Sequence, residues 1–162
     1  MWTFDEKLQT GDEQRILKLV KNAQVFTPEE QAIAVELVQE TRAKPDSGYQ
    51  FIFARDSACN IVAYTCYGII PLTDKRYDLY WIVVDPSQQG KGLSKEILQI
   101  TENRMVAAGG EQVYAETSGT TNYAPAHRFY QRCGFTLAAT LKDFYRPGDD
   151  KLIFQKHLIT FK

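Results

Sequence analysis

The chain has 162 residues, of which 44% are hydrophobic and 24% are charged, and its formal net charge is −1. This length suits one ordinary domain with a sizeable core, and the composition is that of a globular rather than a disordered chain. A nearly neutral chain argues against broad binding of nucleic acid or of an anionic membrane, because both partners require a basic surface.

Signals for membrane insertion, secretion and metal binding are missing from the sequence. No stretch approaches the roughly 20 apolar residues of a membrane-spanning helix, and residues 1–6 do not resemble the start of a signal peptide. Cys59, Cys66 and Cys133 are widely spaced and include no CxxC pair, which argues against a disulfide framework or a zinc site. We therefore expect a cytoplasmic protein without a metal, folded as a single domain over residues 1–162 because no repeat or linker interrupts it.

Two helices are predicted in the first part of the chain. The first begins near Thr10, which has capping-box spacing to Glu13 and precedes an apolar stripe within residues 16–20. The second begins after Thr27, which is followed directly by a proline and three residues later by a glutamate. The side of this second helix that is predicted to be buried contains Ala32, Ile33, Val35, Leu37 and Val38.

Strands and two more helices follow. The predicted strands cover residues 49–55, 61–68, 79–84, 112–117, 135–141 and 152–158. The predicted helices cover residues 92–108 and 124–133, and glycine follows each of them. The first two strands are predicted to form a hairpin, and residues 146–150 are predicted to form the last turn. The aromatic and β-branched run over residues 79–84 predicts a strand that is buried on both faces. This order of elements is typical of an α+β fold.

The most informative stretch is the loop that joins the strand ending at Val84 to the next helix. The first helical turn leaves about four backbone N–H groups without intrahelical partners, and the helix dipole adds partial positive charge there. Gly90 and Gly92 let the backbone approach a bulky anion, and Lys91 and Lys95 add positive charge beside it. The loop therefore predicts a phosphate site at the N-terminus of the helix.

Two common phosphate motifs do not fit this loop. It lacks the GK[ST] ending of a P-loop, and Lys95 occupies the position of the last glycine in a GxGxxG frame that starts at Gly90. The hexapeptide that begins at Gln89, QGKGLS, instead resembles the Q/R-x-x-G-x-G/A signature of the GCN5-related N-acetyltransferase (GNAT) superfamily, with Ser94 in place of the final small residue. A helix start without any ligand is the alternative interpretation of the hexapeptide taken alone.

A second motif lies in residues 123–135 and resembles the GNAT pattern N-x-x-A-x-x-L/F-Y-x-x-x-G-F. The residues in register with this pattern are Ala126, Phe129, Tyr130, Gly134 and Phe135. The motif asparagine falls on Tyr123, and Asn122 stands one position earlier. Because the two motifs occur in the expected order, the resemblance extends over residues 79–135.

The resemblance implies an α+β fold in three layers, with a mixed central sheet of about six to seven strands and about four helices on both of its faces. In this family the strand that ends at Val84 splays from the next strand and opens a V-shaped cleft for acetyl-CoA. The residues that the resemblance assigns to acetyl-CoA are Ile82, Val83, Val84, Gln89, Gly90, Lys91, Gly92, Leu93, Ser94, Lys95 and Asn122.

The resemblance also implies direct attack of an amine on the thioester, without a covalent enzyme intermediate. Tyr130 resembles the family tyrosine that protonates the leaving thiolate. Glu116 takes the position of the base that removes a proton from the amine, through water. The alternatives are that Tyr130 is a core aromatic residue and that Glu116 is a solvated strand residue.

Other residues invite a functional interpretation. We expect His127 to face solvent and His157 to be structural or exposed, and no His/Asp pair is spaced to make Cys133 a nucleophile. Aromatic and acidic residues would suit a cationic acceptor, although ordinary packing explains them equally well. These residues are Phe26, Tyr67, Tyr80, Trp81, Asp143, Phe144 and Tyr145.

The predicted function is transfer of an acetyl group from acetyl-CoA to a primary amine of a small molecule or peptide. Two alternatives remain open: a non-catalytic module that binds or senses acyl-CoA on the same fold, and an acetyltransferase for protein N-termini or lysines. As in many relatives, two copies are expected to pair as a homodimer through their terminal strands. Neither nucleic acid nor a membrane is expected as a partner.

Overall fold

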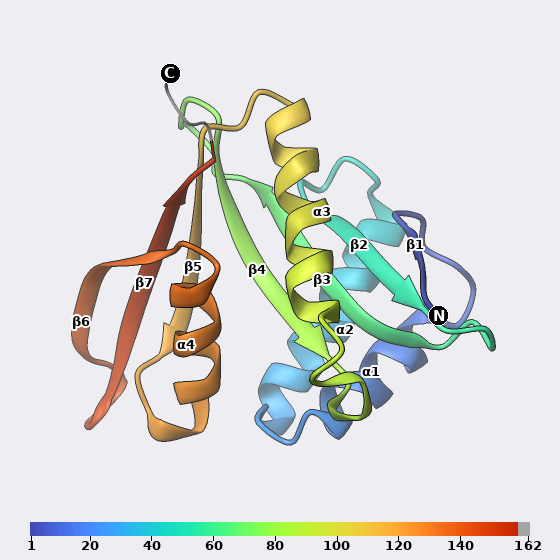
Figure 1. The fold of residues 1–162 in the computed structure, drawn as a ribbon, viewed down its shortest axis with the longest axis horizontal. Helices are drawn as coiled ribbons and strands as arrows, with labels where there is room; N and C mark the ends of the chain where they lie inside the picture. The colour runs from blue at the N-terminus through green and yellow to red at the C-terminus, as the bar shows by residue number, and fades with distance from the viewer. Residues whose placement is uncertain (159–162) are drawn as a thin grey trace. The chain divides into compact units, whose positions relative to one another are not determined.

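The computed structural model describes residues 1–158 (Figure 1). Its strands form a seven-stranded mixed sheet in the order β1-β2-β3-β4-β5-β7-β6, and the described residues include four α-helices. This arrangement confirms the predicted α+β fold. The chain divides into two compact units, one made of Met1–Gly68 with Trp81–Asn103 and the other of Ile69–Tyr80 with the residues from Arg104 onward. The single domain over residues 1–162 stays a prediction.

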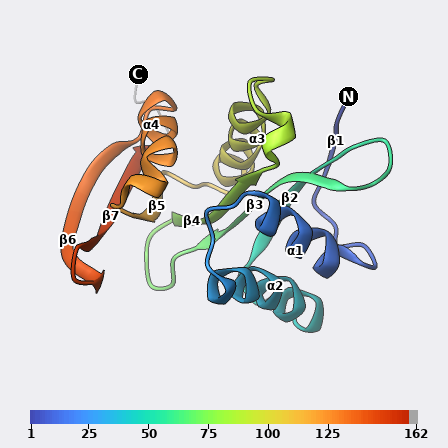
Figure 2. The same cartoon turned by 90° about the horizontal axis from the view of Figure 1, so that it is seen from below.

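The first unit consists of a small antiparallel sheet with helices on both faces. Its elements are β1 (Thr3–Asp5), α1 (Asp12–Asn22), α2 (Pro28–Ala43), β2 (Gln50–Arg55), most of β3 (Ile61–Ile69), the end of β4 (Arg76–Val84), the 3₁₀ turn η1 (Pro86–Gln88) and most of α3 (Leu93–Ala107). Strand β2 pairs antiparallel with both β1 and β3. Helices α1 and α2 cover one face of β2 and β3, and α3 covers the other face (Figures 1 and 2).

Apolar side chains hold these layers together. On the α1 and α2 side, Ile16, Val20 and Val38 pack with Phe53 and Tyr64, and all five side chains are buried. On the other side, the hydroxyl groups of Thr65 in β3 and Thr101 in α3 lie 2.7 Å apart, and both residues are fully buried. Polar groups that are buried between a helix and a sheet need a hydrogen-bond partner. The contact between the two hydroxyl groups therefore constrains the position of α3 on β3.

The two predicted capping boxes have different outcomes. At α2 the Glu30 N–H donates to Thr27 Oγ1 over 3.2 Å, and the Thr27 N–H donates to Glu30 Oε1 over 3.1 Å, which confirms the box. The box at Thr10 is wrong, because α1 begins at Asp12 after Gly11, which has a left-handed φ of 89°. The buried Asp12 carboxylate accepts the Gln9 N–H over 2.8 Å and supplies the polar contact at this helix start.

Two predictions of burial are wrong in part. In α2, Val38 is buried and Leu37 packs against the core as predicted, whereas Ile33 is 47% exposed, Ala32 is exposed, and Ala34 is buried instead. Strand β4 begins at Arg76 rather than at Leu79 and is not buried on both faces, because Tyr80 is 39% exposed. Its aromatic and β-branched residues reflect a preference for strand geometry as much as for a core.

The second unit contains the first part of β4 together with β5 (Gln112–Ser118), η2 (Thr121–Tyr123), α4 (Ala124–Arg132), β6 (Thr136–Arg146) and β7 (Asp149–His157). The start of β4 pairs parallel with β5, and β7 pairs antiparallel with both β5 and β6. Helix α4 covers one face of β5 and β7 (Figure 2). The rings of His127 and Tyr130 lie 5.9 and 5.6 Å from the ring of Phe154 in β7.

The last hairpin is longer than predicted. Pairing of β6 with β7 continues to Arg146 and Asp149, so the turn consists of Pro147 and Gly148 alone. The register shifts between Leu141 and Arg146, where Asp143 has a left-handed φ of 54°. The Asp143 N–H donates to Asp150 Oδ1 over 2.9 Å, which gives the irregular segment a side-chain partner. Strand β1 was not predicted because a three-residue strand carries little periodic signal.

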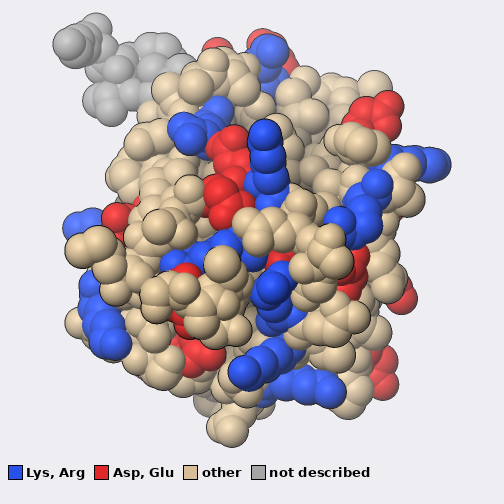
Figure 3. Space-filling model, turned by 90° about the vertical axis from the view of Figure 1, so that its right-hand side faces the viewer, with Lys and Arg blue, Asp and Glu red and all other residues tan. Residues whose placement is uncertain are grey.

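Charge is dispersed over one face of the molecule. On the face shown in Figure 3, Lys and Arg side chains lie among Asp and Glu side chains, which agrees with the net charge of −1. Among residues 1–158, no helix is long and apolar enough to cross a membrane.

Candidate active site

The loop before α3 has a conformation that leaves its backbone accessible. The Asp85 carboxylate accepts the Ser87 N–H over 2.9 Å, and this contact starts the turn η1 directly after β4. Gly90 and Gly92 then adopt left-handed φ values of 77° and 81°. Glycine adopts this conformation without the steric cost that other residues incur, so the sequence permits this path into the helix. The buried side chain of Leu93 anchors the first turn of α3.

The backbone N–H groups from Gly90 to Lys95 have no hydrogen-bond partner in the part of the chain that the structure describes. Within residues 1–158, none of the N–H groups of residues 90–95 donates a hydrogen bond, and the helical ladder starts with the Glu96 N–H, which donates to the Gly92 oxygen over 3.1 Å. A Cβ atom added at Gly90 or Gly92 would meet no atom within 4 Å. Free N–H groups, the helix dipole and the exposed Lys91 and Lys95 together suit an anion such as a pyrophosphate.

The other residues assigned to the cofactor by resemblance lie in different surroundings. Gln89 is exposed and Ser94 is half-buried in the loop. At the end of β4, Val83 is buried and its neighbours Ile82 and Val84 are half-buried. Asn122 is exposed in η2, which belongs to the second unit. These exposures describe the side chains, whereas the predicted contacts of Ile82, Val83 and Val84 with acetyl-CoA involve their backbone groups.

Tyr130 is a buried residue of α4. Its ring lies 5.2 Å from the ring of Phe135 and 5.8 Å from the ring of Phe129, so it is part of the core of the second unit. Burial raises the pKa of Tyr130 well above its usual value, so the phenol stays protonated near neutral pH and can act as a proton donor.

Glu116 does not stand alone on β5. Its Oε2 atom lies 2.7 Å from Nζ of Lys151 in β7, and the side chain of Glu116 is 48% exposed, compared with 16% for Lys151. The ammonium group of Lys151 also lies 4.4 Å from the centre of the Phe144 ring. The sequence offered two interpretations of Glu116, a base that acts through water and a solvated strand residue, and neither of them included this ion pair.

Sequence reasoning missed Asp78, a second carboxylate in the same unit. Burial, with a smaller contribution from the Glu116 carboxylate, raises the pKa of Asp78 to about 6, while Lys151 acts in the opposite direction. A carboxyl group with such a pKa changes charge close to neutral pH, which is common at functional sites. The available signal was an acidic residue inside the aromatic and aliphatic run of β4, but the predicted strand began only at Leu79.

The remaining predicted residues are divided between the two units. The ring of Phe26 lies 5.0 Å from the ring of Trp81 in the first unit, where Tyr67 is also buried. In the second unit, the exposed Phe144 and Tyr145 are in edge-to-face contact at 5.1 Å. Tyr80 and Asp143 are also exposed residues of the second unit.

The two histidines are not catalytic candidates in this arrangement. The expectation that His127 faces solvent is wrong, because its ring is half-buried on Phe154 and its Nε2 atom lies 2.8 Å from the Ser118 carbonyl oxygen. His157 is exposed at the end of β7. Residues 1–158 contain no cluster of three His, Cys, Asp or Glu side chains that could hold a metal ion.

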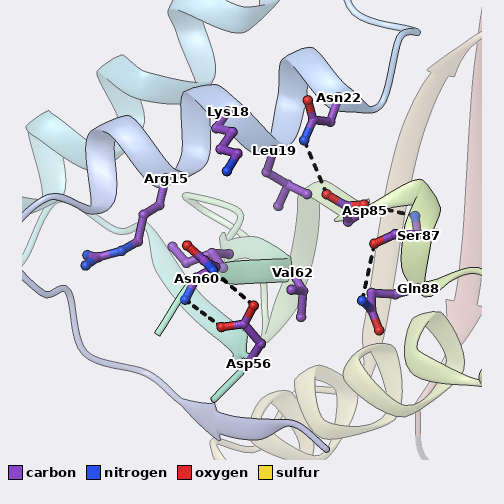
Figure 4. A pocket seen from close by; sticks show the side chains of 11 residues that line it. Arg15, Lys18, Leu19, Asn22, Asp56, Asn60, Val62, Asp85, Ser87 and Gln88 are labelled. Carbon is purple, nitrogen blue, oxygen red and sulfur yellow. Dashed lines mark hydrogen bonds between the residues drawn. The ribbon is translucent and has the colours of Figure 1, made fainter. Parts of the chain in front are cut away.

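A separate cavity of about 320 Å³ lies in the first unit between α1, the β2–β3 turn and the start of η1 (Figure 4). Its polar side chains already contact one another: Asn60 Nδ2 donates to Asp56 Oδ2 over 3.0 Å, and Asn22 Nδ2 donates to Asp85 Oδ2 over 3.4 Å. Arg15 and Lys18 line the same cavity. None of the residues assigned to the cofactor or to catalysis lines it.

Comparison with known proteins identifies the family. The sequence model of the Acetyltransferase (GNAT) family matches residues 16–135. A GNAT-family protein from Desulfovibrio desulfuricans, described as a candidate acetyltransferase, is 40% identical to the chain. Its crystal structure superposes with a TM-score of 0.94 over 98% of this chain and 100% of that one. The chain therefore belongs to the GNAT acetyltransferase family, which confirms the resemblance that the two motifs indicated.

More distant structures share the fold. The ribosomal-protein-S18-alanine N-acetyltransferase from Escherichia coli is 19% identical, with a TM-score of 0.76 over 100% of this chain and 97% of that one. An aminoglycoside 6'-N-acetyltransferase in complex with coenzyme A is 14% identical, with a TM-score of 0.76 over 100% of this chain and 99% of that one. At these identities the likeness concerns the fold alone. No curated protein sequence matches the chain significantly.

Proposed function

We propose that this chain is an acetyl-CoA-dependent N-acetyltransferase that acts on a primary amine of a small molecule or peptide in a ternary complex. The observation that carries the proposal is the loop before α3, in which the N–H groups of residues 90–95 have no partner among residues 1–158. Membership of the GNAT family supplies the reaction class. The loop supplies what the pyrophosphate of coenzyme A requires, namely backbone donors, two lysines and no obstructing Cβ atoms.

The proposal divides the recognition of coenzyme A among three groups of residues. The pyrophosphate binds the backbone of residues 90–95, with Lys91 and Lys95 adding charge and Gln89 preceding the turn. The pantetheine arm binds the backbone of Ile82, Val83 and Val84, and Asn122 contributes a further hydrogen bond. Leu93 offers only its N–H, because its side chain is buried. Ser94 replaces a smaller residue of the family motif, and its half-buried hydroxyl group is a further donor.

In the proposed reaction, acetyl-CoA supplies the acetyl group as a thioester. The acceptor reaches the enzyme mostly as an ammonium ion and must lose one proton before its nitrogen can attack. The carbon–nitrogen bond then forms, the carbon–sulfur bond breaks, and Tyr130 gives its proton to the departing sulfur. The nitrogen loses a second proton, which restores the phenol, so one proton is released to solvent in each turnover. A carboxylate of the protein takes the first proton, and the resemblance to the family assigns this role to Glu116.

Two classes of acceptor amine are candidates. The names of the structural neighbours include an alanine of a ribosomal protein and an aminoglycoside as acceptors, so this fold serves both protein and small-molecule amines. A non-catalytic module that binds or senses acyl-CoA is the alternative function, and it differs from an enzyme only in the absence of turnover. The predicted cytoplasmic location and the predicted homodimer remain part of the proposal.

Thermal unfolding with acetyl-CoA, followed by release of free thiol in the presence of an amine panel, tests the proposal. At a ligand concentration of about 100 Kd, binding adds about 2.7 kcal/mol, which corresponds to roughly 5–10 °C in Tm for a chain of this size. A dose-dependent shift with thiol release supports the transferase. A shift without thiol release on any amine indicates the sensing module, and no shift at millimolar acetyl-CoA refutes both functions.

A further inference from the structure

The face of β5 and β7 opposite α4 carries a cluster of charged side chains. Along β7, Phe154 contacts the rings of α4, and side chains of a strand alternate between its faces. Ile153 and Lys151 therefore point to the other face, and so does Glu116, which is paired in register with Ile153. The ion pair of 2.7 Å between Glu116 and Lys151 lies on this face.

Asp78 lies on the same face because of the register between β4 and β5. The start of β4 pairs parallel with β5, with Asp78 opposite Tyr114, and Glu116 is two residues further along the strand. Residues paired in register share a face, as do residues two apart. The neighbours of Asp78, Tyr77 and Leu79, point the other way and are 5% and 4% exposed.

The charges around Asp78 can be assigned one by one. On β4, Arg76 forms an ion pair of 3.0 Å with Glu111. On β5, Glu116 is held by Lys151 of β7, and the register partner of Asp78 is Tyr114. Asp78 itself forms no ion pair or hydrogen bond with any of residues 1–158, although it is half-buried. It is therefore the carboxylate of this cluster that remains open to an incoming ammonium group.

We propose that Asp78 is the catalytic residue that accepts the proton of the acceptor amine, and that Glu116 and Lys151 are positioning residues that set the charge around it. This inference rests on the proposed function and replaces Glu116 as the base in it. In the step, one N–H bond of the alkylammonium breaks, its proton passes to an Asp78 carboxylate oxygen, and the electron pair stays on nitrogen for the attack on the thioester. The protonated Asp78 then returns the proton to solvent.

The electrostatics of the cluster agree with this assignment. Burial and the neighbouring Glu116 raise the pKa of Asp78 to about 6, which leaves it mostly ionised at pH 7 and close enough to neutral to take up a proton during turnover. The two positioning residues act in opposite directions, because the carboxylate of Glu116 raises the pKa of Asp78 and the ammonium of Lys151 lowers it. Removing each of them must therefore shift the titration of Asp78 in opposite directions.

The test is the pH dependence of kcat/KM for the best amine of the panel, measured for the wild type and for four variants. We expect the acidic limb of the wild type near pH 6, moved to lower pH in Glu116→Gln and to higher pH in Lys151→Met. Asp78→Asn should lose the limb and about 10²- to 10⁴-fold in rate. Glu13→Gln, which removes the ion pair between Glu13 and Arg42 in the first unit, is the matched control and should keep the wild-type profile.

The shift of Tm by acetyl-CoA shows whether each variant is folded and binds the co-substrate. Turnover by the wild type together with an unchanged profile in Asp78→Asn would overturn this inference alone. Loss of the limb in Glu116→Gln, rather than its displacement, would return the role of base to Glu116. Absence of turnover by the wild type with every amine would overturn the proposed function and this inference with it.

Discussion

Replacing Arg55 with methionine tests the most deeply buried ion-pair network of the first unit. The guanidinium group donates from Nη1 and Nη2 to the two carboxylate oxygens of Asp12, both over 2.9 Å, and from Nε to Asp5 over 2.7 Å. Asp12 is 0% exposed and Arg55 is 2% exposed. The variant keeps an unbranched apolar stem of similar size but leaves Asp12 with Arg15, at 3.1 Å, as its cationic partner.

We expect this substitution to lower the free energy of unfolding by about 3–5 kcal/mol, because it removes the cation that contacts both Asp12 oxygens and leaves this buried carboxylate with the single contact to Arg15. Arg42→Met is the matched control. Arg42 also makes two hydrogen bonds to one carboxylate of α1, over 2.6 and 3.2 Å, but its partner is Glu13 and its own side chain is 40% exposed. Solvent screens this pair, so its loss should be much smaller.

The measurement is urea unfolding at pH 7, monitored by circular dichroism, with the slope m compared between variants to exclude changes in the unfolded state. Thermal unfolding gives a second measurement. A loss of about 3–5 kcal/mol in Arg55→Met corresponds to a decrease in Tm of roughly 6–20 °C, at about 2–4 °C per kcal/mol for a chain of this size. Equal losses in Arg55→Met and Arg42→Met would refute the argument, because burial would then make no difference to the cost of removing the cation.

The pH dependence gives an independent check of the same network. Burial by itself would raise the pKa of Asp12, but the hydrogen bonds from Arg55 and from the Gln9 N–H outweigh it and hold the pKa below its usual value. In the wild type this contribution is therefore present above the unfolded pKa of about 3.9 and is lost as the pH falls through the folded pKa. In Arg55→Met the hydrogen bonds from Arg55 are lost, so the pKa of Asp12 rises relative to that in the wild type. The deficit relative to the wild type should therefore shrink as the pH falls through this raised pKa.

Three further substitutions test the loop, the tyrosine and the helix cap. Gly92→Ala should weaken acetyl-CoA binding in calorimetry by about tenfold, or about 1.4 kcal/mol. Gly148→Ala, at the same φ of 81°, should leave the affinity unchanged, and equal effects would contradict an anion site at the loop. Tyr130→Phe should lower kcat by about 10²-fold without changing the affinity for acetyl-CoA; an unaltered kcat would leave Tyr130 a structural residue. Thr27→Ala should cost about 1 kcal/mol in urea unfolding, whereas Thr10→Ala, which removes no cap, should cost much less, and similar losses would contradict the assigned cap.

Local signals in the sequence were enough to predict most elements of the fold. The capping box at Thr27 and the glycine after α4 involve contacts within a few residues, so the sequence contains all the information needed. The same reasoning failed at Thr10, because the start of α1 depends on Asp12 and its partner Arg55, which is 43 residues away. A capping motif competes with tertiary contacts, and in this case the buried ion pair determines where the helix starts.

The candidate site divides in the same way. The glycine loop and Tyr130 follow from contiguous motifs, and both could be named without a structure. Asp78 and Lys151 acquire their meaning only from the pairing of β4, β5 and β7, which brings distant residues onto one face of the second unit. A shift of one residue in the register would send either side chain to the opposite face. Neither residue type nor spacing in the sequence contains that register.

Strand β6 forms one edge of the sheet, and all but one of its residues are exposed. The outer row of backbone N–H and C=O groups on such a strand can recruit a strand from another molecule. Register shifts between Leu137 and Ala139 and between Leu141 and Arg146 interrupt this row, so residues 139–141 offer a regular edge only about 10 Å long. Any partner that extends the sheet, including a second copy of the chain, must therefore form a short ladder there and gain the rest of its affinity from side chains such as Leu137 and Leu141, which are 50% and 40% exposed.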